Sequence, residues 1–293
     1  MLLAATEYVR PGSLAEAVEE LAARQGARVL AGGQSLINVL KHRAASVELL
    51  VDVSRLEELR FIDVAADGTA RIGAATTYGE LERSAELAAS HAIIGKVAAG
   101  TVDRQVRARG TIGGNACFAD PASNYPPLLV ALGAELEIAG EGGTRTVAAE
   151  DFFLGLWRTA VGPGEVLTAI KLPPLAGAGV GYRSLQIAAD SWALARAAAW
   201  VALGDPVEDA RIVLGCVAAT PVRASAAEQV LIGGPRSAAA AAEAGALAAQ
   251  GLDPPSDVHA SGGYRREMAA VMAARAVSDA LGFGEEEVAS NGR

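Results

Sequence analysis

Two double-glycine turns constrain this chain more than any other feature of its sequence. The first is AGGQSLI at residues 31–37, and the second is TIGGNACFADP at residues 111–121. Glycine has no Cβ, so its backbone reaches positive φ and a bulky ligand can approach it closely. Successive N–H groups in such a turn bind anions without any lysine or arginine. Each turn is therefore either a tight connection between packed elements or part of a site for a dinucleotide pyrophosphate.

A nucleotide-binding site of the Rossmann type is excluded by the glycine spacing. Neither turn contains G-x-G-x-x-G, and no Walker motif is present. The stretch 177–181, GAGVG, has a similar spacing, but Pro173 and Pro174 precede it and no helical pattern follows. A dinucleotide would therefore bind through another fold.

Alternating helical and strand patterns indicate an α+β chain. Ser13 with Glu16 and Thr77 with Glu80 are typical of capping boxes at the start of helices. A further helix is expected within 93–106, whereas 119–127 contains three prolines and is expected to be largely loop. Short apolar runs predict strands at residues 28–31, 49–53, 71–75, 134–138 and 166–172.

The best domain boundary is the Pro173-Pro174 pair together with the glycine-rich stretch that follows it. Beyond it, segments 181–185, 193–203 and 211–217 are consistent with three strands of one sheet. The middle segment is ambiguous because alanine favours helix. Helices are expected at residues 222–231, 237–250 and 264–281.

The charge and the ligand-type residues exclude several functions. The net charge is −9 and the 25 basic residues are scattered, which disfavours binding to nucleic acid. Two cysteines, Cys117 and Cys216, and three separated histidines do not make a zinc or iron–sulfur site, which needs about four ligands. The N-terminus has no signal-peptide pattern, and stretch 188–203 is interrupted by charges and too short to span a bilayer. We expect a cytoplasmic protein with no metal and no direct membrane insertion.

The two turns, at this separation, resemble those of the FAD-binding medium subunit of the molybdenum hydroxylase family, which includes carbon monoxide dehydrogenase and xanthine dehydrogenase. The likeness continues through most of the chain, in ADPASNYP, DFFLG, GPGEVLTAIKLPP, ATPVRASAAE and YRREMAAVMAARAV. It implies a two-lobed FAD-binding region of the vanillyl-alcohol-oxidase (PCMH) type at 1–175, with lobes at about 1–55 and 56–175. A small α+β C-terminal domain of the CO dehydrogenase flavoprotein type would follow at 176–285, and a flexible tail at 286–293.

The resemblance also implies a division of labour. A large subunit with molybdenum on molybdopterin cytosine dinucleotide oxidises the substrate, and a small subunit with two [2Fe–2S] clusters relays electrons to the flavin of this chain. The flavin passes them to a quinone, O2, NAD or another acceptor, and the expected assembly is a dimer of heterotrimers. FAD would be non-covalent, since neither residues 31–37 nor residues 111–115 offer a histidine or cysteine for attachment. No catalytic acid or base is expected here, because the cofactor carries the redox chemistry.

By resemblance, both turns wrap the pyrophosphate and ribityl chain of FAD. Asn124 replaces a frequent aspartate, and segment 186–193 lacks a basic pair that many relatives carry, which puts NAD in doubt and favours a neutral acceptor. Trp192 either contacts the flavin ring or packs in the C-terminal core, and Arg183 either reaches the cofactor or is solvated. The full predicted set is Ala31, Gly32, Gly33, Gln34, Ser35, Leu36, Thr111, Ile112, Gly113, Gly114, Asn115, Asp120, Asn124, Leu167, Arg183 and Trp192.

Two other functions remain open at this point. A stand-alone FAD-dependent oxidoreductase of the same fold would need its own acid–base pocket, and no cluster of histidine, tyrosine or carboxylate suggests one. A scaffold subunit that has lost its flavin is disfavoured by the intact glycines and by Asn115. The organic substrate is not encoded in this chain under the leading hypothesis.

Overall fold

The computed structural model describes residues 3–101 and 103–283, so the predicted tail at 286–293 lies outside the described residues. The chain forms two compact units. The first comprises Met1–Ala119 and Ala134–Pro174, and the second comprises Asp120–Gly133 and Leu175–Arg293. The second unit therefore takes in a segment from the middle of the chain as well as its C-terminal part. Within the described residues, no helix is long and apolar enough to cross a membrane.

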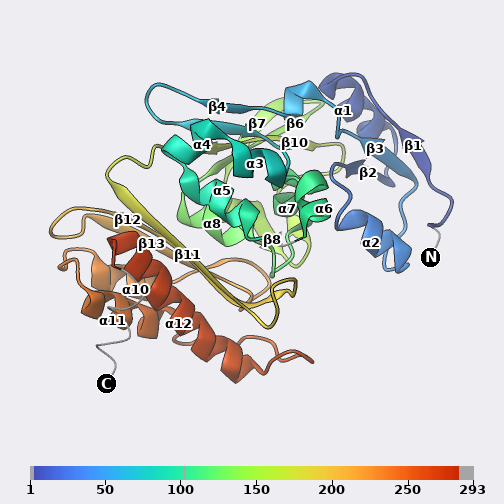
Figure 1. Ribbon diagram of the computed structural model, residues 1–293. Helices are drawn as coiled ribbons and strands as arrows, with labels where there is room; N and C mark the ends of the chain where they lie inside the picture. Colours follow the sequence, from blue (N-terminus) through green and yellow to red (C-terminus); the bar gives the residue numbers. More distant parts are fainter. Residues whose placement is uncertain (1–2, 102, 284–293) are drawn as a thin grey trace. The chain divides into compact units, whose positions relative to one another are not determined.

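The first unit begins with a small parallel sheet in the order β1-β3-β2 (Figure 1). Its strands are β1 (Glu7–Val9), β2 (Ala27–Leu30) and β3 (Leu49–Asp52), and its helices are α1 (Leu14–Ala23) and α2 (Leu36–Lys41). Ser13 caps α1 by accepting a hydrogen bond from the Glu16 amide at 3.2 Å. Glu16 itself accepts from the amide of Gly12, not of Ser13, so this cap is not the reciprocal box that the sequence suggested.

A five-stranded sheet follows, in the order β4-β5-β10-β6-β7, with every pairing antiparallel. Thr77 and Glu80 form the predicted capping box. The helix expected within 93–106 is two helices, α5 and α6, separated at Gly100, which ends α5. The strands are β4 (Ile62–Val64), β5 (Ala70–Gly73), β6 (Glu135–Gly140), β7 (Gly143–Ala148) and β10 (Val166–Leu172), with the hairpin β8 (Phe153–Gly155) and β9 (Arg158–Thr159). The helices are η1 (Glu57–Leu59), α3 (Tyr78–Arg83), α4 (Ala85–Ser90), α5 (Ala92–Ala99), α6 (Arg104–Arg109), α7 (Ile112–Phe118) and α9 (Ala149–Phe152).

The second unit is an antiparallel sheet in the order β11-β12-β13-β14 with helices packed on it (Figure 1). The alanine-rich segment whose conformation was ambiguous is strand β12. Alternate residues Ala195, Ala197 and Ala199 are fully buried against the helices, so packing overrides the helical preference of alanine. The elements are α8 (Tyr125–Ala131), β11 (Ala178–Gln186), β12 (Ala193–Ala202), β13 (Asp209–Gly215), β14 (Val222–Arg223), α10 (Ser225–Leu231), α11 (Ala238–Ala248) and α12 (Gly262–Leu281).

Helix α12 lies close to strand β11 at two glycines. A Cβ placed on Gly179 would lie 1.7 Å from the Ala280 carbonyl oxygen, and one on Gly181 would lie 1.9 Å from that of Ala276. The two glycines are two residues apart on a strand and the two alanines are four apart on a helix, so each pair shares one face. These glycines of the GAGVG stretch therefore serve helix–sheet packing rather than a flexible linker.

The expectation of loop throughout 119–127 is wrong at its end. Helix α8 begins at Tyr125, with Pro126 and Pro127 in its first turn. Proline is tolerated there because the first amides of a helix have no partner within the helix. All seven residues of α8 are buried, so packing fixes the helix where the prolines alone suggested irregular chain.

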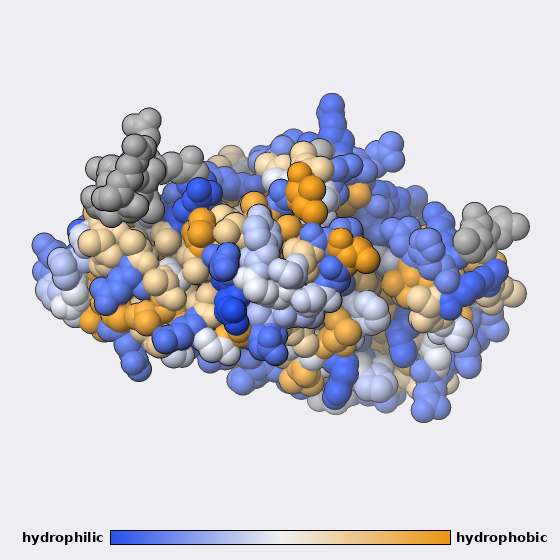
Figure 2. Space-filling model, turned by 90° about the horizontal axis from the view of Figure 1, so that it is seen from below, coloured by the Kyte–Doolittle hydropathy of each residue, from blue (hydrophilic) through white to orange (hydrophobic). Residues whose placement is uncertain are grey.

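Hydrophobic side chains on the face seen in Figure 2 occur in small patches among hydrophilic ones. Scattered exposure of this kind is ordinary for a folded surface. Three large side chains that are more than half exposed are close together in sequence, namely Leu154, Leu156 and Trp157 of the β8–β9 hairpin.

Candidate functional site

The first glycine turn leaves β2 at Leu30 and enters α2 at Leu36. Gly33 has φ +74, a conformation that glycine adopts without strain. The Gln34 side chain donates to the Gly32 carbonyl at 3.1 Å, and the Asn38 side chain donates to the Gln34 carbonyl at 2.8 Å. These two bonds hold the carbonyl groups of the turn and leave its amides to point elsewhere.

Five consecutive amides of this turn, Gly32 to Leu36, have no protein acceptor among the residues that the structure describes. Ser35, which precedes α2, makes no side-chain cap bond to the helix. Successive N–H groups without a protein acceptor are typical of anion-binding turns. The turn therefore has the donor set that a diphosphate would need.

The second glycine turn is built differently. Its amides already donate to protein oxygens: Ile112 to Thr76 O at 3.1 Å, Gly113 to Ala74 O at 3.0 Å, Gly114 to Thr111 Oγ1 at 3.0 Å and Asn115 to Thr111 O at 3.0 Å. The expectation that both turns present free amides is thus wrong for this one, because Thr111 is the N-cap of α7. What this turn offers a ligand is its side chains and an open backbone surface.

The two glycines of the second turn have different reasons to be glycine. A Cβ on Gly113 would lie 2.5 Å from that of Ala74, so the neighbouring strand demands a glycine there. Gly114 is exposed, and a Cβ there would meet only Thr111 Oγ1, at 2.7 Å. Among the described residues, the Thr111 hydroxyl is thus the one packing reason for glycine at position 114, and the exposed side of this glycine is open to a ligand.

The fold brings the two turns together in the first unit. A Cβ on Gly32 would lie 2.1 Å from the Arg109 carbonyl oxygen and 2.9 Å from Gly110 Cα, directly before Thr111. The predicted residues 31–36 and 111–115 are therefore neighbours in space, although about 75 residues separate them in sequence. Leu167 belongs to the same unit, in β10, and is 5% exposed.

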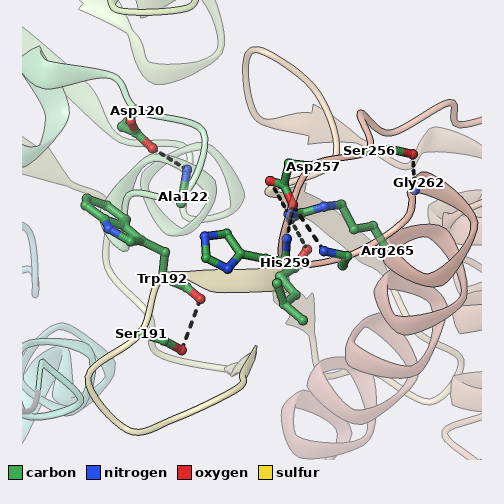
Figure 3. Close-up of polar contacts among 11 residues, drawn as sticks. Asp120, Ala122, Ser191, Trp192, Ser256, Asp257, His259, Gly262 and Arg265 are labelled. Atoms are coloured by element: carbon green, nitrogen blue, oxygen red, sulfur yellow. Dashed lines mark hydrogen bonds and ion pairs between the residues drawn. The ribbon is translucent and has the colours of Figure 1, made fainter.

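The other predicted residues lie in the second unit. Asp120 accepts from the Ala122 amide at 2.9 Å, and the Asn124 carbonyl accepts from the Tyr182 hydroxyl at 2.9 Å. Arg183 forms a bidentate ion pair with Asp279, at 2.6 and 2.7 Å, so its guanidinium is not simply solvated. Trp192 is 62% exposed, so it is not packed in the core (Figure 3).

Neither of the two cysteines has the character of a reactive thiol. Burial raises the pKa of Cys117 to about 12 and also raises the pKa of Cys216, which keeps both as thiols. Among the residues that the structure describes, no three histidine, cysteine, aspartate or glutamate side chains are grouped to hold a metal ion.

Sequence reasoning missed a group of anchors around Asp120 and Asn124. Arg196 on β12 and Tyr182 on β11 donate hydrogen bonds to carbonyl groups of the turn that runs from Asp120 to Asn124. One available signal was that Arg196 interrupts a strand otherwise made of alanine, tryptophan, leucine and valine.

Comparison with known proteins matches both parts of the chain. Residues 4–175 match a family model described as the FAD binding domain in molybdopterin dehydrogenase, and residues 181–280 match the CO dehydrogenase flavoprotein C-terminal domain. The carbon monoxide dehydrogenase medium chain of Afipia carboxidovorans is 41% identical, covering 96% of this chain and 98% of that protein. The glyceraldehyde dehydrogenase medium chain of Sulfolobus acidocaldarius is 36% identical, covering 93% and 97%.

Solved structures agree with the sequence matches. A chain of reconstituted CO dehydrogenase from Oligotropha carboxidovorans superposes with a TM-score of 0.92 at 40% identity, covering 97% of this chain and 100% of that one. The unpaired amides of the first turn and the open surface at Gly114 fit the diphosphate of FAD. This chain belongs to the FAD-binding medium subunits of the molybdenum hydroxylase family, to which carbon monoxide dehydrogenase and xanthine dehydrogenase belong.

Proposed function

We propose that residues 31–36 bind the pyrophosphate of FAD through their backbone amides, and that residues 111–115 hold the adjoining part of the cofactor. The observation that carries the proposal is the run of five amides without a protein acceptor among the described residues. Thr111 keeps its hydroxyl hydrogen for a ligand, because in its bond with Gly114 the oxygen is the acceptor. FAD would be held without a covalent bond, since neither turn contains histidine and the half-buried Cys117 thiol has its pKa raised to about 12 by desolvation.

The family role is electron transfer. When bound, FAD supplies the redox chemistry, accepting electrons from the iron–sulfur clusters of a partner subunit and releasing them to an external acceptor. The protein binds and orients the cofactor, and we assign no acid–base step to it. Asp120, Asn124 and Leu167 are proposed as further cofactor contacts, on the family resemblance alone. Arg183 is a weaker candidate because its guanidinium already engages Asp279.

We propose a neutral electron acceptor, such as a quinone or O2. Segment 186–192, QIAADSW, contains no lysine or arginine and carries the exposed Asp190. Gln186 donates to the Ser191 carbonyl at 2.7 Å, so its side chain shapes the loop that ends at Trp192. An anionic dinucleotide acceptor would gain no charge pairing from this loop.

We propose that this chain assembles with a large molybdenum-containing subunit and a small iron–sulfur subunit into a dimer of heterotrimers. The β8–β9 hairpin supports a contact with the small subunit. Leu154, Leu156 and Trp157 are 54%, 51% and 59% exposed, and clustered exposed apolar side chains often mark protein interfaces. The Trp157 amide donates to the Ala119 carbonyl at 3.3 Å, just past α7, the helix that begins at the second turn. A cluster docked at this hairpin would therefore lie beside a cofactor-binding helix.

The purified chain tests the proposal for FAD. It is expected to carry, or to take up from added FAD, a flavin that survives gel filtration and is released by denaturant. A protein that stays colourless in excess FAD would overturn the assignment. Reduction of the isolated flavoprotein by NADH or an organic substrate would instead indicate a stand-alone oxidoreductase.

A further inference from the structure

The turn between Asp120 and Asn124 is held by its carbonyl groups. All four carbonyl oxygens from Pro121 to Asn124 accept hydrogen bonds from other parts of the second unit. The donors are the Cys216 amide to Pro121 O at 3.0 Å, Arg196 Nη1 to Ala122 O at 2.7 Å and to Ser123 O at 2.5 Å, and the Tyr182 hydroxyl to Asn124 O at 2.9 Å. Four consecutive carbonyls that face one sheet leave little freedom to the backbone between them.

Arg196 is the centre of this arrangement. It is 2% exposed, and its guanidinium carbon lies 5.8 Å from the centre of the Tyr182 ring, within range of a cation–π contact. The two side chains that donate to the turn therefore also contact each other. Tyr182 is half-buried, and desolvation raises the pKa of its hydroxyl, so it stays protonated and able to donate.

A buried arginine that serves only stability would be expected to have all its donors satisfied. Arg196 Nε is buried and has no hydrogen-bond partner among the described residues, and neither has Ser184 Oγ of the facing strand residue. Burying an incompletely paired charge lowers stability. The Nη1 group of Arg196 donates to two carbonyl groups, not to a carboxylate that would neutralise its charge. The arrangement is thus better explained by the need to fix the turn than by stability alone.

We infer that Arg196 is a positioning residue that holds Asp120 and Asn124 in the geometry needed to bind FAD, and that the hydrogen bond from Tyr182 to the same turn supports it. The inference rests on the proposed FAD site, because those two residues are cofactor contacts by family resemblance. Neither Arg196 nor Tyr182 is required to touch the cofactor.

The test measures the dissociation constant of FAD by flavin fluorescence in four variants of the full chain. Tyr182→Phe removes one hydroxyl from a half-buried ring and is expected to weaken FAD binding about threefold to tenfold. Arg196→Met removes two bonds and is expected to weaken it more than about tenfold, with partial recovery in Arg196→Lys. Arg223→Met is the matched control, because Arg223 pairs with Glu228 in the same unit and makes none of the four contacts with the turn.

Coupling to the turn separates positioning from general destabilisation. If Arg196 acts through Asp120 and Asn124, Arg196→Met has little further effect on FAD affinity in an Asp120→Ala, Asn124→Ala background. If Arg196→Met weakened FAD binding by the same factor with and without Asp120 and Asn124, the inference would be overturned. Wild-type FAD affinity in folded Arg196→Met and Tyr182→Phe proteins would also overturn it. Failure of the FAD site itself is recognised separately, since the wild-type chain would then bind no flavin.

Discussion

A Cβ placed on Gly32 would lie 2.1 Å from the carbonyl oxygen of Arg109, so the two glycine turns pack backbone against backbone. The atoms that the Cβ would meet are backbone atoms of Arg109 and Gly110, so relief of the clash requires a backbone shift. Gly32→Ala is therefore expected to destabilise the protein by about 1–3 kcal/mol and to weaken FAD binding at the same time. Thermal unfolding and FAD titration check the two effects.

Gly142→Ala is the control for that substitution, because no atom lies within 4 Å of a Cβ at Gly142. It is expected to leave both unfolding and FAD affinity near wild type. If Gly32→Ala behaved like Gly142→Ala, the close approach of the two turns would not matter to the folded protein.

Substitution of Gly114 is expected to affect FAD affinity more than stability. Among the described residues, the Cβ that Gly114→Val adds would crowd only Thr111 Oγ1, so the expected loss of stability is that of a disturbed helix cap, about 1 kcal/mol. The loss of FAD affinity is expected to be much larger, because the side chain projects from the open surface of the turn. Ser237→Ala is a matched control that removes the cap of α11 and no glycine-turn contact. Retention of FAD by Gly114→Val at wild-type affinity would show that the cofactor does not approach this glycine.

Gly181 tests the packing of α12 on β11. Gly181→Ala would force a Cβ to within 1.9 Å of the Ala276 carbonyl, and the expected destabilisation is about 1–3 kcal/mol. Gly263→Ala, in the first turn of α12 with open space around it, is expected to be neutral or slightly stabilising. Urea unfolding of the two variants checks the contrast, and equal midpoints would contradict it.

Local sequence patterns predicted most elements because glycine turns, capping residues and apolar runs act over a few residues. Ala193–Ala202 escaped such patterns because burial by α12 decides its conformation, and Pro126 in α8 escaped because a helix start accepts proline. Two amides of the second turn, those of Ile112 and Gly113, donate to carbonyl oxygens of Thr76 and Ala74, which are distant in sequence, so a local pattern could not show that these amides are paired. The role of Arg196 likewise depends on the fold, which brings its guanidinium within hydrogen-bond distance of the Ala122 and Ser123 carbonyl oxygens.

His91 gives the first unit a pH-dependent contribution to stability. The side chain is fully buried, and its Nε2 lies 2.9 Å from the Pro173 carbonyl oxygen, to which it donates as a neutral ring. Desolvation lowers the pKa of His91 in the folded protein, while the Pro173 carbonyl opposes the shift. Below the usual histidine pKa of about 6.5 the unfolded chain therefore binds more protons than the folded one, and stability falls as pH falls through that range.

His91→Gln should be less stable than wild type at pH above about 7, and the difference should narrow as the pH is lowered below about 6. Carboxylates with lowered pKa values, such as Glu80 and Asp52, also reduce stability at low pH, but they do so equally in both proteins. The difference between the two unfolding temperatures therefore isolates His91. A difference that is constant from pH 5 to pH 8, or that widens at low pH, would contradict the assigned direction.

The β8–β9 hairpin should separate assembly from cofactor binding. Leu156→Asp places a charge among exposed apolar side chains, and burying that charge without a partner at an interface is unfavourable. Co-expression with the two partner subunits is expected to give little heterotrimer on gel filtration, while the isolated chain keeps its FAD affinity and unfolding temperature. Val258→Asp, at a side chain that is 95% exposed in the second unit, is the control and should assemble normally. Normal yields of active heterotrimer from Leu156→Asp would remove the hairpin from the interface, and loss of assembly in both variants would point to a general effect of added charge.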